Sequence, residues 1–166
     1  QKKVLVCLSG AGLLPSYENF SLILEKLPPT IGYLTIDFPN TGRSSIHDQA
    51  GKNLDNLADA VYELLEELGI SEYILCAHSL SGILACKLLN KPIKCQALLA
   101  IEPTTKNVMF ADFSENPYPE MEEQMMLIEE CGPELYFKSL TQATFSPEIN
   151  KEIWEIMQEK GAELEK

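Results

Sequence analysis

Residues 73–82 read YILCAHSLSG, and this stretch decides the fold class of the 166-residue chain. An apolar, β-prone run leads to a serine at position 79, and a helical pattern starts directly afterwards. Ala77 and Ser81 are both small, which suits a tight strand-to-helix turn whose strained serine leaves no room for larger neighbours two positions away. The stretch therefore predicts a turn that points the Ser79 hydroxyl outward, beside a helix N-terminus that favours negative charge.

Three more apolar runs of strand length occur in the chain. The four predicted strands cover residues 4–8, 31–36, 72–77 and 95–101. Amphipathic helical patterns separate them, before Pro28 and over residues 54–68 and 81–89. Apolar runs of this kind predict strands buried on both faces, and helices between them predict parallel pairing through right-handed crossovers. The fold class is therefore α/β, with a mostly parallel sheet of about four strands and flanking helices.

The strand pattern stops after residue 103. Helical patterns follow over residues 120–130, 134–141 and 147–160. Their methionine and isoleucine residues at helical spacing form either ordinary packing surfaces or the lining of a helical lid over the strand ends. We expect residues 1–103 to form the core and residues 104–166 to form a helical lid or cap region.

The charge distribution bears on the kinds of partner. The chain carries 25 acidic and 13 basic side chains, which gives a formal charge of −12. Residues 103–166 hold 14 of the acids and only 5 of the bases, as solvated helix faces often do. An acidic surface repels phosphate backbones and anionic lipid, so we expect no nucleic-acid and no membrane partner.

The cysteines and the apolar segments indicate the compartment. None of the five cysteines forms a C-x-x-C pair, and Cys7 and Cys76 lie within apolar runs. Buried free thiols in a reducing compartment explain them better than disulfide bonds or a metal site. The apolar run at residues 4–8 is too short for a signal peptide, and no segment reaches the roughly 20 apolar residues of a membrane span. We expect a soluble, cytoplasmic protein.

Two further loops fall where one known superfamily places its motifs. Residues 9–12 read SGAG after the first strand, and residues 37–44 read DFPNTGRS after the second. With the stretch at 73–82, they resemble the oxyanion loop, the D-x-P-G-x-G-x-S turn and the G-x-S-x-G nucleophile elbow of the α/β-hydrolase fold superfamily. The resemblance is to its single-domain lidded hydrolases and covers about residues 3–103. It implies that the four strands correspond to the family's third to sixth, with two strands before and two after this sequence.

The resemblance also implies roles for individual residues. Ser79 would be the nucleophile, and the backbone N–H groups of Leu80 and Ala11 would form the oxyanion hole. Ser79 would attack the carbonyl of an ester, thioester or similar small-molecule substrate and form an acyl-enzyme that water cleaves. No metal and no organic cofactor is implied. Oligomeric state is not predicted by these patterns.

The sequence departs from the family pattern at the elbow and at the general base. Ala77 and Ser81 replace the two glycines of the elbow, so a chance A-x-S-x-S in an ordinary turn is the alternative interpretation. The family's histidine follows the acid in the chain, whereas this chain has only His47 and His78. His78 precedes the nucleophile directly and is expected to point into the scaffold, and His47 lies too early. The chain is therefore either part of a hydrolase that lacks the catalytic histidine or a non-catalytic binding module of the same fold.

The catalytic acid has one candidate. Some family members place it after the sixth strand, where this chain has Glu102 before a proline. Glu102 would orient a histidine there, or would simply cap the strand end. Asp37 is expected to form the turn after the second strand.

A dinucleotide-binding fold is the remaining alternative, because Gly10-Ala11-Gly12 follows the first strand. The G-x-G-x-x-G fingerprint fails at its third glycine, where Pro15 stands, and this fold would leave the Ser79 turn unexplained.

Overall fold

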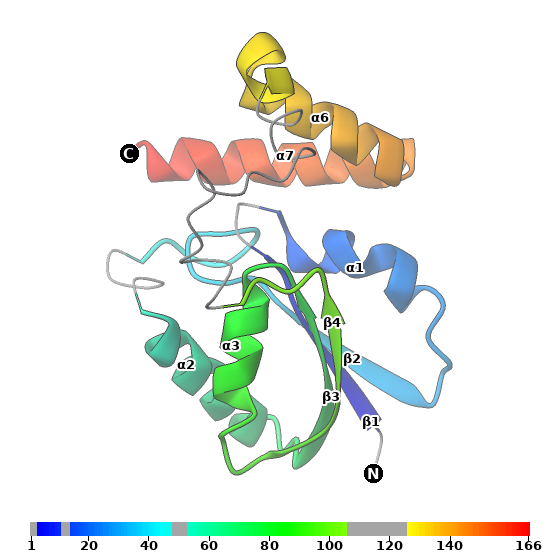
Figure 1. The fold of residues 1–166 in the computed structure, drawn as a ribbon, viewed down its shortest axis with the longest axis vertical. Coiled ribbons are helices and arrows are strands. Elements are labelled where there is room, and N and C mark those ends of the chain that lie inside the picture. The colour runs from blue at the N-terminus through cyan, green and yellow to red at the C-terminus, as the bar shows by residue number, and fades with distance from the viewer. Residues whose placement is uncertain (1–2, 11–13, 48–52, 106–125) are drawn as a thin grey trace, which may run out of the picture.

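The computed structural model describes residues 3–10, 14–47, 53–105 and 126–166. Its centre is one parallel sheet in the order β2-β1-β3-β4 (Figure 1). The strands are β1 (Lys3–Leu8), β2 (Ile31–Ile36), β3 (Glu72–His78) and β4 (Lys94–Ile101). The predicted fold class is confirmed, and the predicted strands differ from these bounds by at most one residue at an end.

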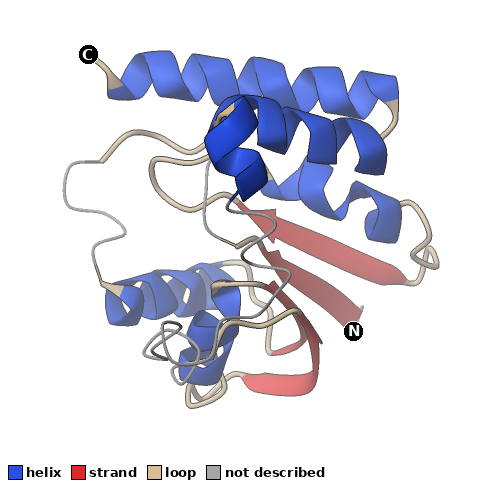
Figure 2. Cartoon of the chain, turned by 45° about the horizontal axis from the view of Figure 1, so that its top comes forward, coloured by secondary structure: helices blue, strands red, loops and turns tan. Residues whose placement is uncertain are grey.

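Helices cover both faces of the sheet (Figures 1 and 2). Helix α1 (Ser16–Leu24) packs on one face. Helices α2 (Leu54–Glu67) and α3 (Ser81–Leu88) pack on the other. The expected helix before Pro28 ends at Leu24, because the amides of Lys26 and Leu27 donate to carbonyls only three residues earlier. The chain from each strand to the next thus crosses a face of the sheet, as parallel pairing requires.

The two-residue period of β1 divides its side chains between two hydrophobic clusters. Leu5 and Cys7 pack against α1, whereas Val6 and Leu8 pack against α2 and α3. All four side chains are almost wholly buried, and complete burial of such a side chain contributes about 1.5–3 kcal/mol. A continuous apolar run therefore suits this central strand.

Cys7 and Cys76 are register partners on β1 and β3, and both are buried free thiols as predicted. The two thiols share a hydrogen bond, which with burial raises the pKa of Cys7. The bond to Cys7 lowers the pKa of Cys76. The two thiols therefore lie side by side in the core, away from solvent.

The expectation that all four strands are buried on both faces is wrong for β4. Leu98, Leu99 and Ile101 are 40%, 49% and 37% exposed. The strand occupies one edge of the sheet, and in the described part of the chain it pairs only with β3. Strand β2, at the opposite edge, is only partly buried. Sequence runs predict the strands themselves, but burial depends on how many neighbours each strand has.

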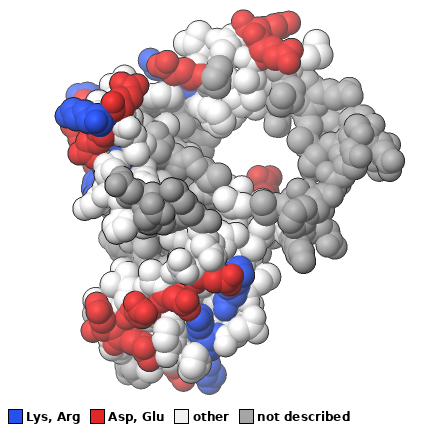
Figure 3. All heavy atoms as spheres, turned by 90° about the vertical axis from the view of Figure 1, so that its left-hand side faces the viewer, with Lys and Arg blue, Asp and Glu red and all other residues white. Residues whose placement is uncertain are grey.

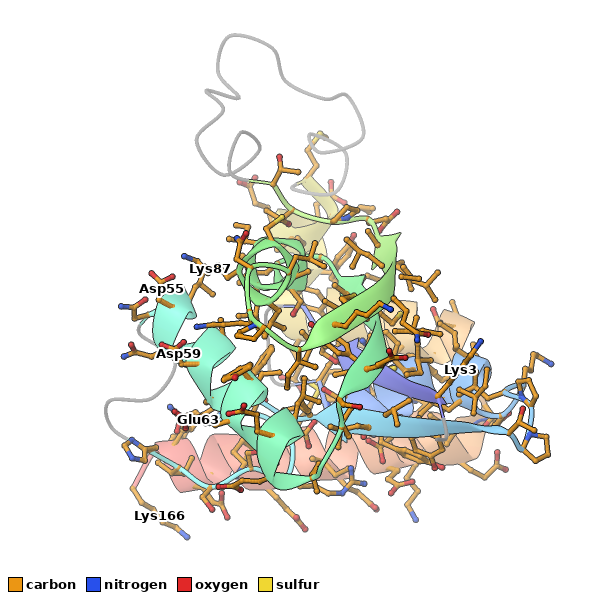
Figure 4. All side chains as sticks on the ribbon, turned by 90° about the horizontal axis from the view of Figure 1, so that it is seen from below. Lys3, Asp55, Asp59, Glu63, Lys87 and Lys166 are labelled. Atoms are coloured by element: carbon orange, nitrogen blue, oxygen red, sulfur yellow. The ribbon has the colours of Figure 1, made fainter. Side chains whose placement is uncertain are left out.

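Ion pairs join α2 to α3 across their exposed side. Asp55 bonds to Lys87 and Asp59 bonds to Lys91. Figure 4 shows the carboxylate of Asp55 turned toward Lys87, and Figure 3 shows acidic and basic side chains side by side on this face. Exposed pairs of this kind contribute little each, up to about 1 kcal/mol. The buried side chains that α2 and α3 share in the core therefore hold the two helices together, and the ion pairs add little.

The turn after β2 follows the prediction made for Asp37. Its carboxylate accepts hydrogen bonds from the backbone N–H of Ser16 at 2.6 Å and of Arg43 at 2.8 Å. Gly42 has φ +48°, and a β-carbon there would lie 2.3 Å from the Asp37 carboxylate. Asn40 has φ +68°, which explains why the family pattern has glycine at this position. Asp37 therefore ties the start of α1 to the turn.

Helices α6 (Pro133–Thr144) and α7 (Pro147–Leu164) follow the sheet. They extend the predicted spans 134–141 and 147–160. Residues 126–131 are also helical, whereas the rest of the predicted helix 120–130 lies outside the described residues. Trp154 Nε1 donates to Thr141 Oγ1 at 2.9 Å and so links the two helices. Figure 1 shows the pair beyond the end of the sheet at which the strands terminate.

Helix α7 is attached to the core through the turn after β2. Arg43 forms two hydrogen bonds with the fully buried carboxylate of Glu18 on α1, and a third with Glu152 on α7 at 2.9 Å. The bond to Glu18 is the main reason why the pKa of Arg43 is raised. Lys160 Nζ donates to the Ser44 carbonyl at 2.7 Å. One exposed ion pair, between Arg43 and Glu152, and one side-chain-to-backbone bond therefore attach α7 to the core.

None of the described helices is both long enough and apolar enough to cross a membrane.

Candidate active site

Ser79 occupies the turn between β3 and α3 in a left-handed backbone conformation, with φ +52°. Such a conformation costs a residue with a β-carbon roughly 1–2 kcal/mol. Three backbone hydrogen bonds hold it: the Ser79 N–H donates to Ile101 at 3.0 Å, and its carbonyl accepts from Gly82 at 2.9 Å and Thr104 at 2.8 Å. The strand-turn-helix geometry inferred from the sequence is therefore present, and the end of β4 supports it.

The small residues around Ser79 are tightly packed. Ala77 is fully buried and Ser81 is 3% exposed. The tightest position is Gly82, where a β-carbon would lie 2.7 Å from Pro103 Cβ and 2.9 Å from the Thr104 carbonyl. Gly82 had no predicted role, although a glycine shortly after the serine of such a turn is the signal for a close approach of this kind.

The loop after β1 lies against the nucleophile candidate. A β-carbon on Gly10 would lie 2.8 Å from Ser79 Cβ and 3.3 Å from Ser79 Oγ. The residue before it is held from two sides, because Ser81 Oγ donates to the Ser9 carbonyl and Asn19 Nδ2 donates to Ser9 Oγ at 3.3 Å. The contact between the loop and the elbow was implied by the resemblance, whereas the roles of Gly10 and Asn19 were missed.

Of the two backbone amides predicted to form the oxyanion hole, the structure describes only one. Leu80 is the N-cap residue of α3, and within the described part of the chain its N–H forms no hydrogen bond. Ala11 lies outside the described residues. An unbonded amide directly after Ser79, at a helix N-terminus, suits the stabilisation of a negatively charged oxygen.

Glu102 follows β4 and comes to the same edge of the sheet as Ser79. Its neighbours Ile101 and Thr104 both bond to the Ser79 backbone. Glu102 has φ +42° and an exposed side chain. Within the described residues its carboxylate has no hydrogen-bond partner, so its role as an acid stays a prediction.

Neither histidine is placed as an evident base for Ser79. His78 is the last residue of β3 and pairs in register with Ile101. His47 is exposed and lies in the turn after β2, where its N–H donates to Asn40 Oδ1 at 2.6 Å and its carbonyl accepts from Asn40 Nδ2. In the described part of the chain, no histidine side chain is hydrogen-bonded to Ser79.

Two surface hollows lie away from this site. One, of about 390 Å³, is lined by Tyr62, Gly69 and Pro92 among others, and one of about 320 Å³ lies between α2 and α3. Neither is lined by any residue of the elbow. Over the described ranges, no three His, Cys, Asp or Glu side chains are grouped as metal ligands.

Comparison with known sequences gives a family match and one close relative. Residues 3–127 match the family described as alpha/beta hydrolase fold. "Putative esterase/lipase 2" of Mycoplasma genitalium is 30% identical over 110 residues, which are 62% of this chain and 38% of that protein.

Solved structures include a closely similar fold. Smu.1393c from Streptococcus mutans has a TM-score of 0.88 at 33% identity, over 98% of this chain and 60% of that one. MenH from S. aureus has a TM-score of 0.62 at 19% identity, over 95% of this chain and 61% of that one. The chain thus spans about two fifths of the curated relative and about three fifths of these two structures.

Proposed function

The chain belongs to the alpha/beta hydrolase fold family, and from this premise we propose that it carries the nucleophile of a serine hydrolase. The substrate class is an ester, a thioester or a similar small carbonyl compound. The name of the relative from Mycoplasma genitalium, an esterase or lipase, supports this class.

The observation that carries the proposal is the strained conformation of Ser79. A left-handed serine between a buried strand and a helix is costly, and three backbone bonds maintain it. In the proposed reaction Ser79 Oγ attacks the carbonyl carbon and its proton passes to a base. The oxyanion of the tetrahedral intermediate accepts a hydrogen bond from the Leu80 amide, with Ala11 as the second proposed donor. The leaving group departs, and water then cleaves the acyl-enzyme.

The base is the element that the described residues do not supply in an evident position. Because the chain spans only 60% of the similar Streptococcus mutans structure, we propose that the histidine lies in a part of the protein beyond this sequence. Glu102 is the proposed acid that orients it. Residues 104–166 are proposed as the lid, and the attachment of α7 to the turn after β2 supports their place over the strand ends.

The experiment compares the full-length protein with its Ser79→Ala variant. Hydrolysis of p-nitrophenyl acetate and covalent labelling by a fluorophosphonate are measured, with circular dichroism as the check on folding. The matched control is Ser21→Ala, because it removes a serine hydroxyl away from the elbow, from a residue that is 3% exposed and has no partner for that hydroxyl among the described residues.

Loss of both signals in Ser79→Ala alone supports the proposal. Labelling that persists in Ser79→Ala identifies another nucleophile and contradicts it. A folded wild-type protein that neither hydrolyses the ester nor reacts with the phosphonate favours the non-catalytic binding module instead.

A further inference from the structure

We propose that Ser81 is a positioning residue, whose hydroxyl fixes the Ser9 carbonyl and so holds the Gly10 backbone against Ser79. The inference rests on the proposed function, because it assigns Ser81 an effect on the reactivity of the Ser79 hydroxyl. It concerns a residue at which this chain departs from the family's G-x-S-x-G pattern.

The bond joins two segments that are far apart in the sequence. Ser81 Oγ donates to the carbonyl oxygen of Ser9, 72 residues earlier, and the bond is buried. Both residues are nearly inaccessible, with 3% exposure at Ser81 and 5% at Ser9. Solvent therefore has little access to replace the bond if the hydroxyl is removed, and the Ser9 carbonyl would lose a partner in a dry environment.

The bond acts on the nucleophile through the next residue. Peptide groups are planar, and the described chain has no cis peptide bond, so fixing the Ser9 carbonyl also fixes the direction of the Gly10 amide. Gly10 is in contact with Ser79, because a β-carbon there would approach Ser79 Oγ to 3.3 Å. A rotation of the Ser9–Gly10 peptide would therefore move backbone atoms that touch the reacting side chain.

A second bond reaches the side chain of Ser9 rather than its carbonyl. Asn19 Nδ2, on α1, donates to Ser9 Oγ at 3.3 Å. The weaker geometry of this contact leaves the Ser81 bond as the principal restraint on the peptide. The elbow thus orients its own neighbouring loop, since Ser81 lies only two residues after Ser79.

The test uses the labelling chemistry of Ser79 in the full-length protein. The rate of reaction with a fluorophosphonate is measured against its concentration, which separates the maximal rate of bond formation from the half-saturating concentration. The variants are Ser81→Ala, which removes only the hydroxyl, and Ser81→Cys, which keeps the size of the side chain with a thiol as a weak donor. The matched control is Ser16→Ala, because Ser16 Oγ donates to the Ile36 carbonyl at 2.6 Å and is also buried, at 1% exposure.

We expect Ser81→Ala to lower the maximal labelling rate about tenfold, equivalent to about 1.4 kcal/mol, with no change in the half-saturating concentration. Ser81→Cys is expected to restore part of the rate through its weak S–H donor, and Ser16→Ala to lose stability without a change in rate. A wild-type rate in Ser81→Ala, or an equal decrease in Ser16→Ala, would overturn the assignment. Failure of the wild-type protein to react would instead overturn the proposed function and this inference with it.

Discussion

Gly10 and Ser79 approach so closely that a β-carbon on Gly10 would lie 2.8 Å from Cβ of Ser79. Real side chains do not tolerate that distance, so the loop after β1 meets the elbow without room for a methyl group. The contact links the two segments on which the proposed chemistry depends.

The first prediction is that Gly10→Ala lowers the rate of Ser79 labelling about 100-fold, because a small displacement of a reacting group has an effect of that size. Its cost in stability is expected to be about 1–3 kcal/mol, as for other overpacked sites. Labelling kinetics and urea unfolding measure the two effects.

Gly161→Ala is the control, since a β-carbon there meets nothing within 4 Å. In an α-helix interior that change is expected to stabilise by up to about 1 kcal/mol. Equal labelling rates in both variants would show that the contact does not affect Ser79.

The second prediction concerns the buried carboxylate of Glu18. Arg43→Ala leaves this fully buried charge without its bidentate partner, and we expect a loss of about 3 kcal/mol in the free energy of unfolding. Glu152→Gln removes only the exposed contact of the same guanidinium, so its expected cost is below about 1 kcal/mol. Adding Glu18→Gln to Arg43→Ala should recover part of the loss, because no charge is then buried. Similar small losses in both single variants would mean that the buried pair contributes little.

The third prediction is a pH dependence at the end of α7. Lys160 donates to the Glu163 carboxylate and lowers the pKa of that carboxyl below its ordinary value of 4.5. The folded state therefore favours the ionised form. The resulting stability is complete above about pH 4.5 and is lost as the pH falls through the lower folded pKa. Urea unfolding at a series of pH values should show the difference between wild type and Glu163→Gln closing on acidification. Glu165→Gln serves as the comparison, since Glu165 forms no ion pair within the described residues, and a pH-independent difference for Glu163→Gln would refute the assignment.

The fourth prediction concerns thiol reactivity. Burial and the shared hydrogen bond keep Cys7 protonated, and Cys76 is equally inaccessible. Iodoacetamide at about pH 8 should therefore modify Cys86 and Cys131, which are exposed, and leave the β1–β3 pair unmodified. Mass spectrometry of the native protein detects the modified sites, and unfolding in urea should make all five cysteines reactive. Rapid modification of Cys7 in the native protein would contradict the buried arrangement.

The sequence predicted most of the regular structure, because apolar runs and helical spacing are local signals. The strand over residues 31–36 has the predicted bounds, and the α2 pattern ends within one residue of its prediction. The elbow was also predictable, since small residues around a serine between strand and helix patterns report a local steric requirement.

Contacts between distant segments could not be predicted in this way. Arg43 and Glu152 are 109 residues apart, and their contact depends on how α7 lies on the core. A charged residue on a short helix, such as Glu18, is predicted from the sequence to be exposed to solvent. Its burial becomes understandable only when Arg43 is known to be its partner. The exposure of β4 likewise depends on its position in the sheet, which an apolar run does not reveal.

The left-handed residues at one edge of the sheet limit how the protein can be made more heat-resistant. Asn40, Ser79 and Glu102, which follow β2, β3 and β4, all have positive φ values. Glycine adopts this conformation without a steric cost, so replacing Glu102 with glycine is a direct route to a higher melting temperature. That change would also remove the proposed acid, and the same replacement at Ser79 would gain stability and remove the proposed nucleophile. At this end of the sheet, substitutions that raise the melting temperature therefore lower the reactivity, and selection for heat resistance alone would reduce activity.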